Sequence, residues 1–196
     1  MASEVVDTDS NVATLAISES TTEWHKQRLV TRNLPLRDTF DPQFTGSNVI
    51  CYVLDSGLDQ LHPEFANADI MTVHNPTNGS YLEYIGAGNS GSGFTFEDNH
   101  GHGTAVSSLI VGETLGVSKD ASLGVVKISG DDGNADISDV IEGVNSMFNH
   151  RTHYSMLDSG GRHRTSIMLC AWTFPKSSVL DRLIEHCWNR RFVVVA

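Results

Sequence analysis

Two side chains in this sequence have the types and the settings that acid–base chemistry requires. Asp55 comes directly after an apolar run, Val49–Leu54, and is followed by Ser56 and Gly57. His102 stands between two glycines, ahead of another apolar stretch. A carboxylate that holds one nitrogen of an imidazole leaves the other nitrogen free to act as a general base. For an isolated Asp after a strand, capping of the next turn is the commoner role, because turns favour Asp.

The elements around these two residues would bring them together. Val49–Leu54 is rich in β-branched and aromatic residues, which predicts a strand buried on both faces. Asp55 then lies at the carboxyl end of a strand, where ligands and chemistry collect in open parallel sheets. Residues 102 to about 112 are typical of a helix that begins at His102. We therefore expect Asp55 and His102 to lie within hydrogen-bond distance at this edge of the sheet.

The rest of the chain alternates between short apolar runs and amphipathic stretches. Further strands are expected over residues 69–74, 123–128, 166–171 and 192–196, and further helices from near residue 136 and over residues 179–188. This alternation predicts βαβ units with right-handed crossovers. The expected fold class is α/β, with three layers and a mostly parallel sheet that has helices on both faces. Residues 1–20, rich in Ser, Thr, Asp and Glu, are expected to form a flexible segment before a folded part over residues 21–196.

The two motifs together carry a resemblance to a known family. Asp55-Ser56-Gly57-Leu58, followed later by Gly101-His102-Gly103-Thr104, resembles the Asp and His motifs of the subtilisin-like serine proteases, the subtilase family or peptidase S8. The order Asp, then His, is that of the subtilisin triad. The start of the folded part, from Trp24, is similar to that of proteinase K-like enzymes. His100 is the rival base, but only His102 has Gly before it and Gly-Thr after it.

The resemblance implies a subtilisin-like fold, a serine-type endopeptidase and a peptide or protein substrate. It also implies two extended segments that pair with the substrate backbone. Here these segments are Gly133, Asn134 and Ala135 on one side, and Cys170, Ala171 and Trp172 on the other. Relatives carry Ser-Leu-Gly-Gly where this chain has Cys170-Ala171-Trp172-Thr173, so Trp172 is expected to narrow or fill the primary specificity pocket. That difference favours the alternative, a catalytically inactive subtilase-like binding or structural protein.

The third member of the triad has no counterpart in this sequence. The family's nucleophile sits in a Gly-Thr-Ser motif, and no Gly-Thr-Ser occurs in the 196 residues. The oxyanion Asn of relatives follows the strand that corresponds to the last residues of this chain. The resemblance therefore implies the N-terminal portion of a catalytic domain, incomplete at the C-terminus and inactive alone. The remaining part of the same domain is then an implied partner.

No metal ion or cofactor is predicted. Gly86–Gly91 fits G-x-G-x-x-G, but more loop follows instead of the helix that a dinucleotide site needs. Residues 151–164 are expected to be a polar, solvated loop, because their histidines are not backed by Cys or carboxylates at ligand spacing. Calcium is bound by some relatives through an Asp at the position of Glu64. The Glu at this position is the reason that no calcium site is predicted here.

Composition excludes several other classes of function. The chain of 196 residues is long enough for one domain with a substantial core, and its net charge of -11 argues against nucleic acid and against an anionic membrane surface. No apolar run reaches about 18 residues, and the first twenty residues are not expected to act as a secretory leader, with a leader on a longer precursor left open. The compartment is left open, although relatives are mostly secreted or vacuolar. Cys51, Cys170 and Cys187 are expected to be buried free thiols, with one disulfide as the open alternative.

Overall fold

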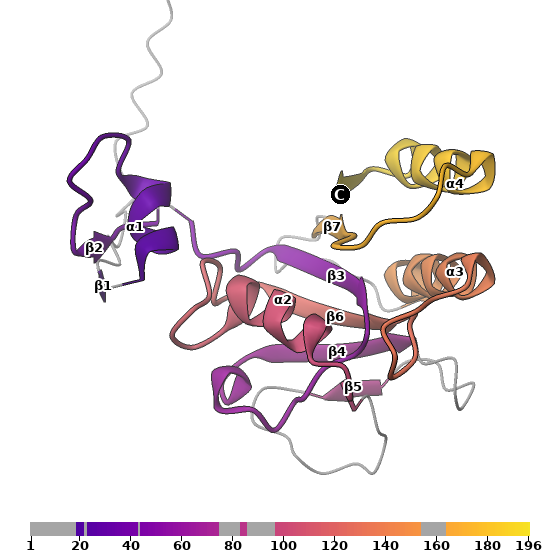
Figure 1. The fold of residues 1–196 in the computed structure, drawn as a ribbon, viewed down its shortest axis with the longest axis horizontal. Helices are drawn as coiled ribbons and strands as arrows, with labels where there is room; N and C mark the ends of the chain where they lie inside the picture. The colour runs from indigo at the N-terminus through magenta and orange to yellow at the C-terminus, as the bar shows by residue number, and fades with distance from the viewer. Residues whose placement is uncertain (1–18, 22, 43, 75–82, 86–96, 154–163) are drawn as a thin grey trace, which may run out of the picture. The chain divides into compact units, whose positions relative to one another are not determined.

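The computed structural model describes residues 19–21, 23–42, 44–74, 83–85, 97–153 and 164–196 (Figure 1). The chain divides into two compact units, residues 1–43 and residues 44–196. Most of the expected flexible segment, and the glycine-rich stretch over residues 86–91, lie outside the described residues. Each unit is described by itself.

The first unit is small and was not predicted from the sequence. Strand β1 (Glu19–Ser20) pairs antiparallel with strand β2 (Thr39–Phe40), and helix α1 (Trp24–Val30) lies between them in the chain. The buried side-chain amide of Gln27 donates to the Thr21 carbonyl oxygen at 2.7 Å, which ties the helix to the start of the unit. Two-residue strands carry too little periodicity for a sequence pattern to reveal them.

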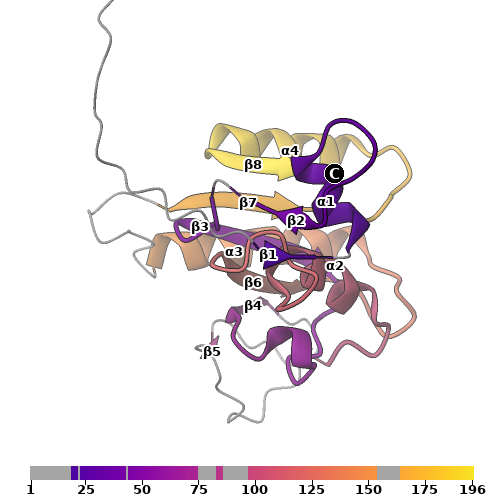
Figure 2. The same cartoon turned by 90° about the vertical axis from the view of Figure 1, so that its left-hand side faces the viewer.

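The second unit is built on a six-stranded sheet, whose strands lie side by side in the order β5-β4-β6-β3-β7-β8 (Figure 2). These strands are β3 (Val49–Asp55), β4 (Asp69–His74), β5 (Glu83–Ile85), β6 (Ser122–Lys127), β7 (Thr165–Leu169) and β8 (Phe192–Val195). All neighbouring pairs are parallel except β4 and β5, which are antiparallel. The expected mostly parallel sheet is therefore confirmed, and only the short edge strand β5 was missed.

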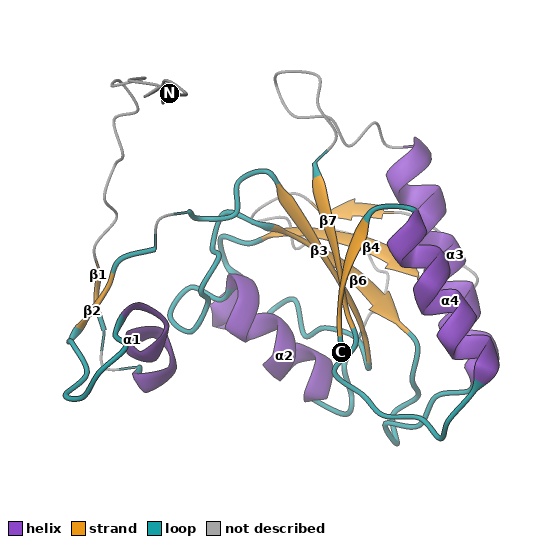
Figure 3. Cartoon of the chain, turned by 90° about the horizontal axis from the view of Figure 1, so that it is seen from above, coloured by secondary structure: helices purple, strands orange, loops and turns teal. Residues whose placement is uncertain are grey.

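Helices cover both faces of this sheet, as predicted (Figure 3). Helix α2 (His102–Val111) packs on one face, while α3 (Ile137–His153) and α4 (Ser178–Asn189) pack on the other.

The central strand β3 has buried side chains on both faces. Ile50, Tyr52 and Leu54 belong to the core beneath α3 and α4, whereas Cys51 and Val53 belong to the core beneath α2. Successive side chains of a strand point to opposite faces. Asp55 follows Cys51 and Val53 in this alternation. Its carboxylate is therefore directed to the same face of the sheet, toward α2.

Two of the expected boundaries are wrong. Strand β7 ends at Leu169 rather than at residue 171. The last bond to β8 runs from the Cys170 amide to the Val195 carbonyl oxygen at 2.8 Å, after which Ala171 and Trp172 line a cavity instead of continuing the strand. Helix α3 continues to His153, which takes the first residues of the expected polar loop into the helix. Residues 154–163 of that loop lie outside the described residues.

All three cysteines are free and buried, so the expectation of buried thiols is confirmed. Burial raises the pKa of the Cys51 and Cys170 thiols to about 12 and that of Cys187 to about 11. Thiols with such raised pKa values stay protonated and unreactive at neutral pH. As for the membrane, the described part of the chain contains no helix with the length and apolar character of a transmembrane span.

Strand β8 forms one edge of the described sheet, and one of its faces is open. Val193 is 50% exposed and Val195 is 46% exposed, while Phe192 on the opposite face is buried. Helix α4 packs on that buried face, whereas α2 lies over β3 and does not reach β8. An apolar edge strand with an uncovered face is a template for pairing with another chain.

The 196-residue chain is therefore expected to self-associate through β8, and Val193→Lys should weaken that association. Removing one buried valine contact and adding a charge should raise the dissociation constant about tenfold. Sedimentation velocity over a concentration series measures the change. Val179→Lys is the matched control, because Val179 is 49% exposed but lies on helix α4 and not on the edge strand itself. Equal effects of the two substitutions would contradict the assignment of the edge.

Candidate active site

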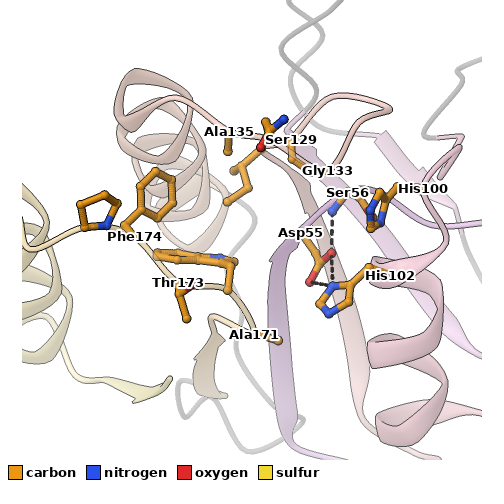
Figure 4. A pocket seen from close by; sticks show the side chains of 14 residues that line it. Asp55, Ser56, His100, His102, Ser129, Gly133, Ala135, Ala171, Thr173 and Phe174 are labelled. Carbon is orange, nitrogen blue, oxygen red and sulfur yellow. Dashed lines mark hydrogen bonds and ion pairs between the residues drawn. The ribbon is translucent and has the colours of Figure 1, made fainter.

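Asp55 and His102 meet at the carboxyl edge of the sheet, as the motifs predicted. The Nδ1 atom of His102 lies 2.8 Å from Oδ1 and 3.0 Å from Oδ2 of Asp55 (Figure 4). The Asp55 side chain is 5% exposed, whereas the His102 side chain is 46% exposed. The pair thus has a buried carboxylate behind an imidazole that opens toward solvent.

This geometry fixes the roles of the two ring nitrogens. Carboxylate oxygens accept hydrogen bonds, so Nδ1 of His102 carries a proton and donates to Asp55. In the neutral ring, Nε2 is then left with a free lone pair. Among the described residues, both side-chain hydrogen bonds of His102 are made with Asp55. The arrangement can therefore accept a proton at Nε2 from a group that approaches the solvent-exposed side of the ring.

His100, the rival base, does not occupy this place. Its ring centroid lies 6.2 Å from that of His102, and the two rings meet edge to face. On the other side its ring lies against Gly133, where a Cβ would come within 2.6 Å of His100 Nε2. His100 therefore stands between the histidine that faces Asp55 and the loop that follows β6.

A close backbone approach sets the position of His102. A Cβ atom built on Gly103 would overlap the Gly57 carbonyl oxygen and lie 3.2 Å from the Asp55 Cβ. The first turn of α2 can touch the turn after β3 only because position 103 has no side chain. Gly101, which has a φ of 90°, turns the chain into the helix in a conformation that favours glycine. The two glycines beside His102 are thus required by geometry.

Asp98 lies beside the pair and was not singled out by the sequence analysis. Its carboxylate accepts hydrogen bonds from the Ser56 hydroxyl, the Gly101 amide, and both the amide and the hydroxyl of Thr104, at 2.6 to 2.8 Å. Burial acts to raise its pKa, but these donors outweigh burial and lower the pKa to about 2. An Asp just before a predicted helix is a capping signal that could have singled it out.

A buried lysine ties the same two loops together. Lys127 is 4% exposed and lies opposite Asp55 in the pairing of β6 with β3. Its ammonium group donates to the Ser56 carbonyl oxygen and, at 3.3 Å, to the Glu97 carbonyl oxygen. Hydrogen bonds from a charged group are stronger than those between neutral groups. Lys127 therefore holds the loop after β3 against the loop before α2.

A cavity of about 430 Å³ adjoins the Asp55–His102 pair. It is lined by residues of the pair's own loops, the loop after β6 and the loop after β7. The expected substrate segments are represented there by Gly133, Asn134, Ala135, Ala171 and Trp172. Cys170 does not line the cavity, because its side chain is 2% exposed and belongs to the core beneath α3 and α4.

The two expected substrate segments differ in which of their polar groups make hydrogen bonds within the chain. The Asn134 amide donates to Asp132 Oδ1 at 3.0 Å, and its carbonyl oxygen accepts from the Gly130 amide at 3.0 Å. The main-chain groups of Asn134 are therefore occupied within their own turn. Opposite them, the indole nitrogen of Trp172 donates to the Leu54 carbonyl oxygen at 2.9 Å, and its ring lies 5.1 Å, edge to face, from Phe174. Trp172 is thus held in place as part of the cavity lining.

Glu64 is used for structure. Its carboxylate accepts hydrogen bonds from the Thr114 amide at 3.0 Å and the Leu115 amide at 3.1 Å, and from the Thr114 hydroxyl. Despite some desolvation, these donors lower its pKa. The side chain therefore fixes the loop after α2. The described residues contain no group of three or more His, Cys, Asp or Glu side chains that could hold a metal ion.

Comparison with known proteins identifies the family. The model of the Peptidase_S8 family, described as the subtilase family, matches residues 46–184. The chain belongs to the subtilase family. The matched region includes both members of the Asp55–His102 pair and the cavity beside them, so the resemblance that the motifs carried is confirmed.

Individual subtilases are similar to parts of this chain. It is 33% identical over 128 residues to the alkaline serine exoprotease A of Vibrio alginolyticus, which is 62% of this chain and 20% of that protein. It is 36% identical over 103 residues to the subtilase-type proteinase psp3 of Schizosaccharomyces pombe, covering 53% of this chain and 20% of that protein. With the subtilisin-like protease 5 of Arthroderma benhamiae it shares 32% identity over 143 residues, 73% of this chain and 32% of that protein.

The fold also matches a solved subtilase structure. The structure of a cold adapted subtilisin-like serine proteinase superposes with a TM-score of 0.69 and 23% identity, covering 90% of this chain and 55% of that chain. This match shows the subtilisin-like fold. The present chain spans between 20% and 32% of the length of the three curated relatives named above.

Substitution of Gly103 should separate the two members of the pair. In Gly103→Ala, the new methyl group meets backbone that cannot move aside, so α2 must shift away from β3. We expect the free energy of unfolding to fall by about 1–3 kcal/mol, measured by urea denaturation. Gly130→Ala is the control, because its Cβ would meet only the end of the Asp132 side chain, at 3.3 Å. Equal stability of the two variants would contradict the close approach.

The hydrogen-bonded Asp98 carboxylate should make stability depend on acid pH. Its pKa in the folded chain, about 2, lies below the value of about 3.9 in unfolded chains. Folding therefore favours the charged form, and this stabilisation is complete above about pH 5 and lost as the pH falls through about 2. The full shift corresponds to roughly 2.6 kcal/mol, which solvent screening reduces to about 1 kcal/mol.

Asp98→Asn should lose the pH-dependent stabilisation that the charged Asp98 carboxylate provides. The difference in the free energy of unfolding between the parent chain and Asp98→Asn should shrink by about 1 kcal/mol between about pH 5 and about pH 2. Urea denaturation at a series of pH values measures it. Asp131→Asn, which removes an exposed carboxylate nearby, should show no such convergence with the parent. A constant difference for Asp98→Asn would show that its hydrogen bonds do not favour the charged form.

Proposed function

We propose that this subtilase chain supplies the Asp and the His of the Asp-His-Ser triad of a serine endopeptidase. The observation that carries the proposal is the hydrogen bonding of His102 Nδ1 to the buried Asp55 carboxylate. In this proposal, residues 21–196 are the N-terminal portion of the catalytic domain, and residues 1–20 are a segment before it, of which Glu19–Ser20 pair as β1 with β2.

The chemistry of the two residues follows from their geometry. Nε2 of His102 takes the proton of a serine hydroxyl as that oxygen attacks the scissile carbonyl carbon. The same nitrogen then gives the proton to the leaving amine. Asp55 keeps the ring in the tautomer that has its lone pair at Nε2, and its negative charge stabilises the imidazolium that forms. The near-complete burial of Asp55 strengthens this interaction, because less solvent screens it.

The substrate is a peptide or a protein, bound across the cavity. Extended segments on either side of a cleft can pair with a substrate strand between them. We assign Gly133, Asn134 and Ala135 to one side, and Cys170, Ala171 and Trp172 to the other. The main-chain groups of Asn134 are bonded within its own turn, and the Cys170 amide is bonded to Val195. We therefore assign the main-chain hydrogen bonds with the substrate to Gly133 and Ala135 on one side, and to Ala171 and Trp172 on the other.

The nucleophile is absent from this chain in the proposal. Ser56 lines the cavity, but its hydroxyl donates to Asp98 and accepts from the Gly103 amide. Ser129 also lines the cavity and is 8% exposed, with no hydrogen bond to His102. The remaining part of the domain would supply the serine, and it would cover the open face of β8. The 196 residues alone are therefore expected to be inactive.

A second function is favoured by one observation. Trp172 and Phe174 place two aromatic rings at the cavity, and the hydrogen bond to Leu54 prevents the indole from swinging aside. A site narrowed in this way could bind a peptide without cleaving it. The alternative is a catalytically inactive subtilase-like binding or structural protein, and the same experiment separates the two functions.

The test begins with the gene. The enzyme proposal expects the reading frame beyond codon 196 to encode an Ala-Gly-Asn step and a later Gly-Thr-Ser, and a frame that lacks them overturns it. The product of that frame should cleave a chromogenic peptide. Asp55→Asn should lower its kcat by about 10⁴-fold, and His102→Ala by about 10⁶-fold. Glu142→Gln, which neutralises an exposed carboxylate on α3, should leave kcat unchanged.

The 196-residue chain provides the complementary measurement. It should neither cleave the peptide nor react with a serine-directed fluorophosphonate probe, since no described serine hydroxyl is bonded to His102. Turnover together with covalent labelling of a serine would show that the nucleophile lies within these residues. Peptide binding without turnover by the longer product would favour the alternative function.

A further inference from the structure

Asp98 contacts both the turn after β3, which follows Asp55, and the start of α2, which carries His102. It comes from neither of the motifs that identify the family site, and it does not line the cavity. The geometry points to Asp98 as a positioning residue, a single charged acceptor that sets the position of His102 relative to Asp55. This inference rests on the proposed function only in that the pair it positions is the catalytic one.

The first set of contacts holds the helix. Asp98 Oδ1 accepts from the Gly101 amide at 2.8 Å, and Oδ2 accepts from the Thr104 amide at 2.8 Å and the Thr104 hydroxyl at 2.6 Å. These donors lie on either side of His102 in the chain. The amides at a helix start have no partners within the helix. By binding them, Asp98 fixes the backbone from which the His102 side chain projects.

The second set of contacts reaches the strand. The Ser56 hydroxyl donates to Asp98 Oδ1 at 2.7 Å and accepts from the Gly103 amide at 2.9 Å. The Ser56 amide in turn donates to Asp55 Oδ1 at 2.7 Å. An unbroken series of hydrogen bonds therefore runs from Asp98 through Ser56 to the carboxylate that holds His102.

Charge is essential to this arrangement. The two oxygens of a carboxylate can accept all four of these donors, whereas an Asn at the same place has one oxygen and an NH₂ group that would face other donors. The Lys127 ammonium group binds the carbonyl oxygens of Ser56 and Glu97, beside the residues that Asp98 joins. A cation and an anion thus secure the same two loops.

A purely structural role is the simpler alternative. Asp at a helix start commonly stabilises the helix by capping it, without affecting any catalytic group. That role predicts lower stability in Asp98→Asn but an intact hydrogen bond between Asp55 and His102 in the molecules that remain folded. The positioning role predicts that this hydrogen bond weakens even when the chain is folded. The two roles therefore differ in a spectroscopic measurement on the pair itself.

The experiment uses the 196-residue chain and the low-field proton resonance of the His102 Nδ1–H group. The resonance is assigned by its loss in His102→Gln, and it is followed well below the unfolding temperature of each variant. In Asp98→Asn we expect it to disappear, or its exchange with water to be about tenfold faster. Asp131→Asn is the matched control, since it removes the same charge from a residue whose side chain, among the described residues, accepts a hydrogen bond from the Asn99 side chain and makes none with the Asp55–His102 pair.

Ser56→Ala breaks the connection while leaving the contacts of Asp98 with the helix in place. It should weaken the resonance as well, and the double variant should lose little more than Asp98→Asn alone, because both act through one series of hydrogen bonds. If Asp98→Asn does not fold, Ser56→Ala decides the question.

Two results would overturn the inference. One is a folded Asp98→Asn, or Ser56→Ala where only that variant folds, whose resonance and exchange rate equal those of the parent. The other is an equal change in Asp131→Asn, which would make the effect one of charge alone. The measurement needs no serine nucleophile, so its outcome is independent of whether the longer product cleaves peptides.

Discussion

The structure of this site depends on one close contact, between the first turn of α2 and the turn after β3. The absence of a side chain at Gly103 lets the helix backbone reach the Gly57 carbonyl oxygen. At this separation the His102 side chain spans the remaining distance to Asp55 with a direct hydrogen bond. A larger residue would push the two elements apart, and no change of side-chain rotamer could restore the contact, because backbone atoms set the limit.

The register of the sheet fixes the position of Asp55, as the close contact at Gly103 fixes that of His102. Strand β3 is buried on both faces, and its alternate side chains pack into two separate cores. The strand cannot slip by one residue without exchanging those cores. Asp55 is therefore directed toward α2 by the packing of residues that take no part in chemistry. Its carboxylate is held by the fold before any substrate or serine is present.

The sequence predicted the parts of the site that depend on local pattern. Asp55 was located by an apolar run, and His102 by its flanking glycines and the helix after it. Asp98, Lys127 and Ser56 were missed, because their roles arise from bonds between segments that are distant in the chain, such as the 71 positions between Lys127 and Ser56. The early end of β7 was missed as well, because the apolar run continues through Cys170 and Ala171 and no local signal marks the point at which the chain leaves the sheet.

Trp172 shows how one side chain can serve both the sheet and the cavity. The pairing of β3 with β7 ends at Val53 and Leu169, which leaves the Leu54 carbonyl oxygen beyond the last paired residues. The Trp172 indole donates to that oxygen, and its ring then lines the cavity next to Phe174. A buried carbonyl group without a donor is unfavourable, so movement of the indole away from Leu54 would be opposed by the loss of this hydrogen bond. The shape of the cavity on this side is therefore coupled to the strand that ends in Asp55, and a substrate that displaced the ring would disturb the backbone that holds the pair.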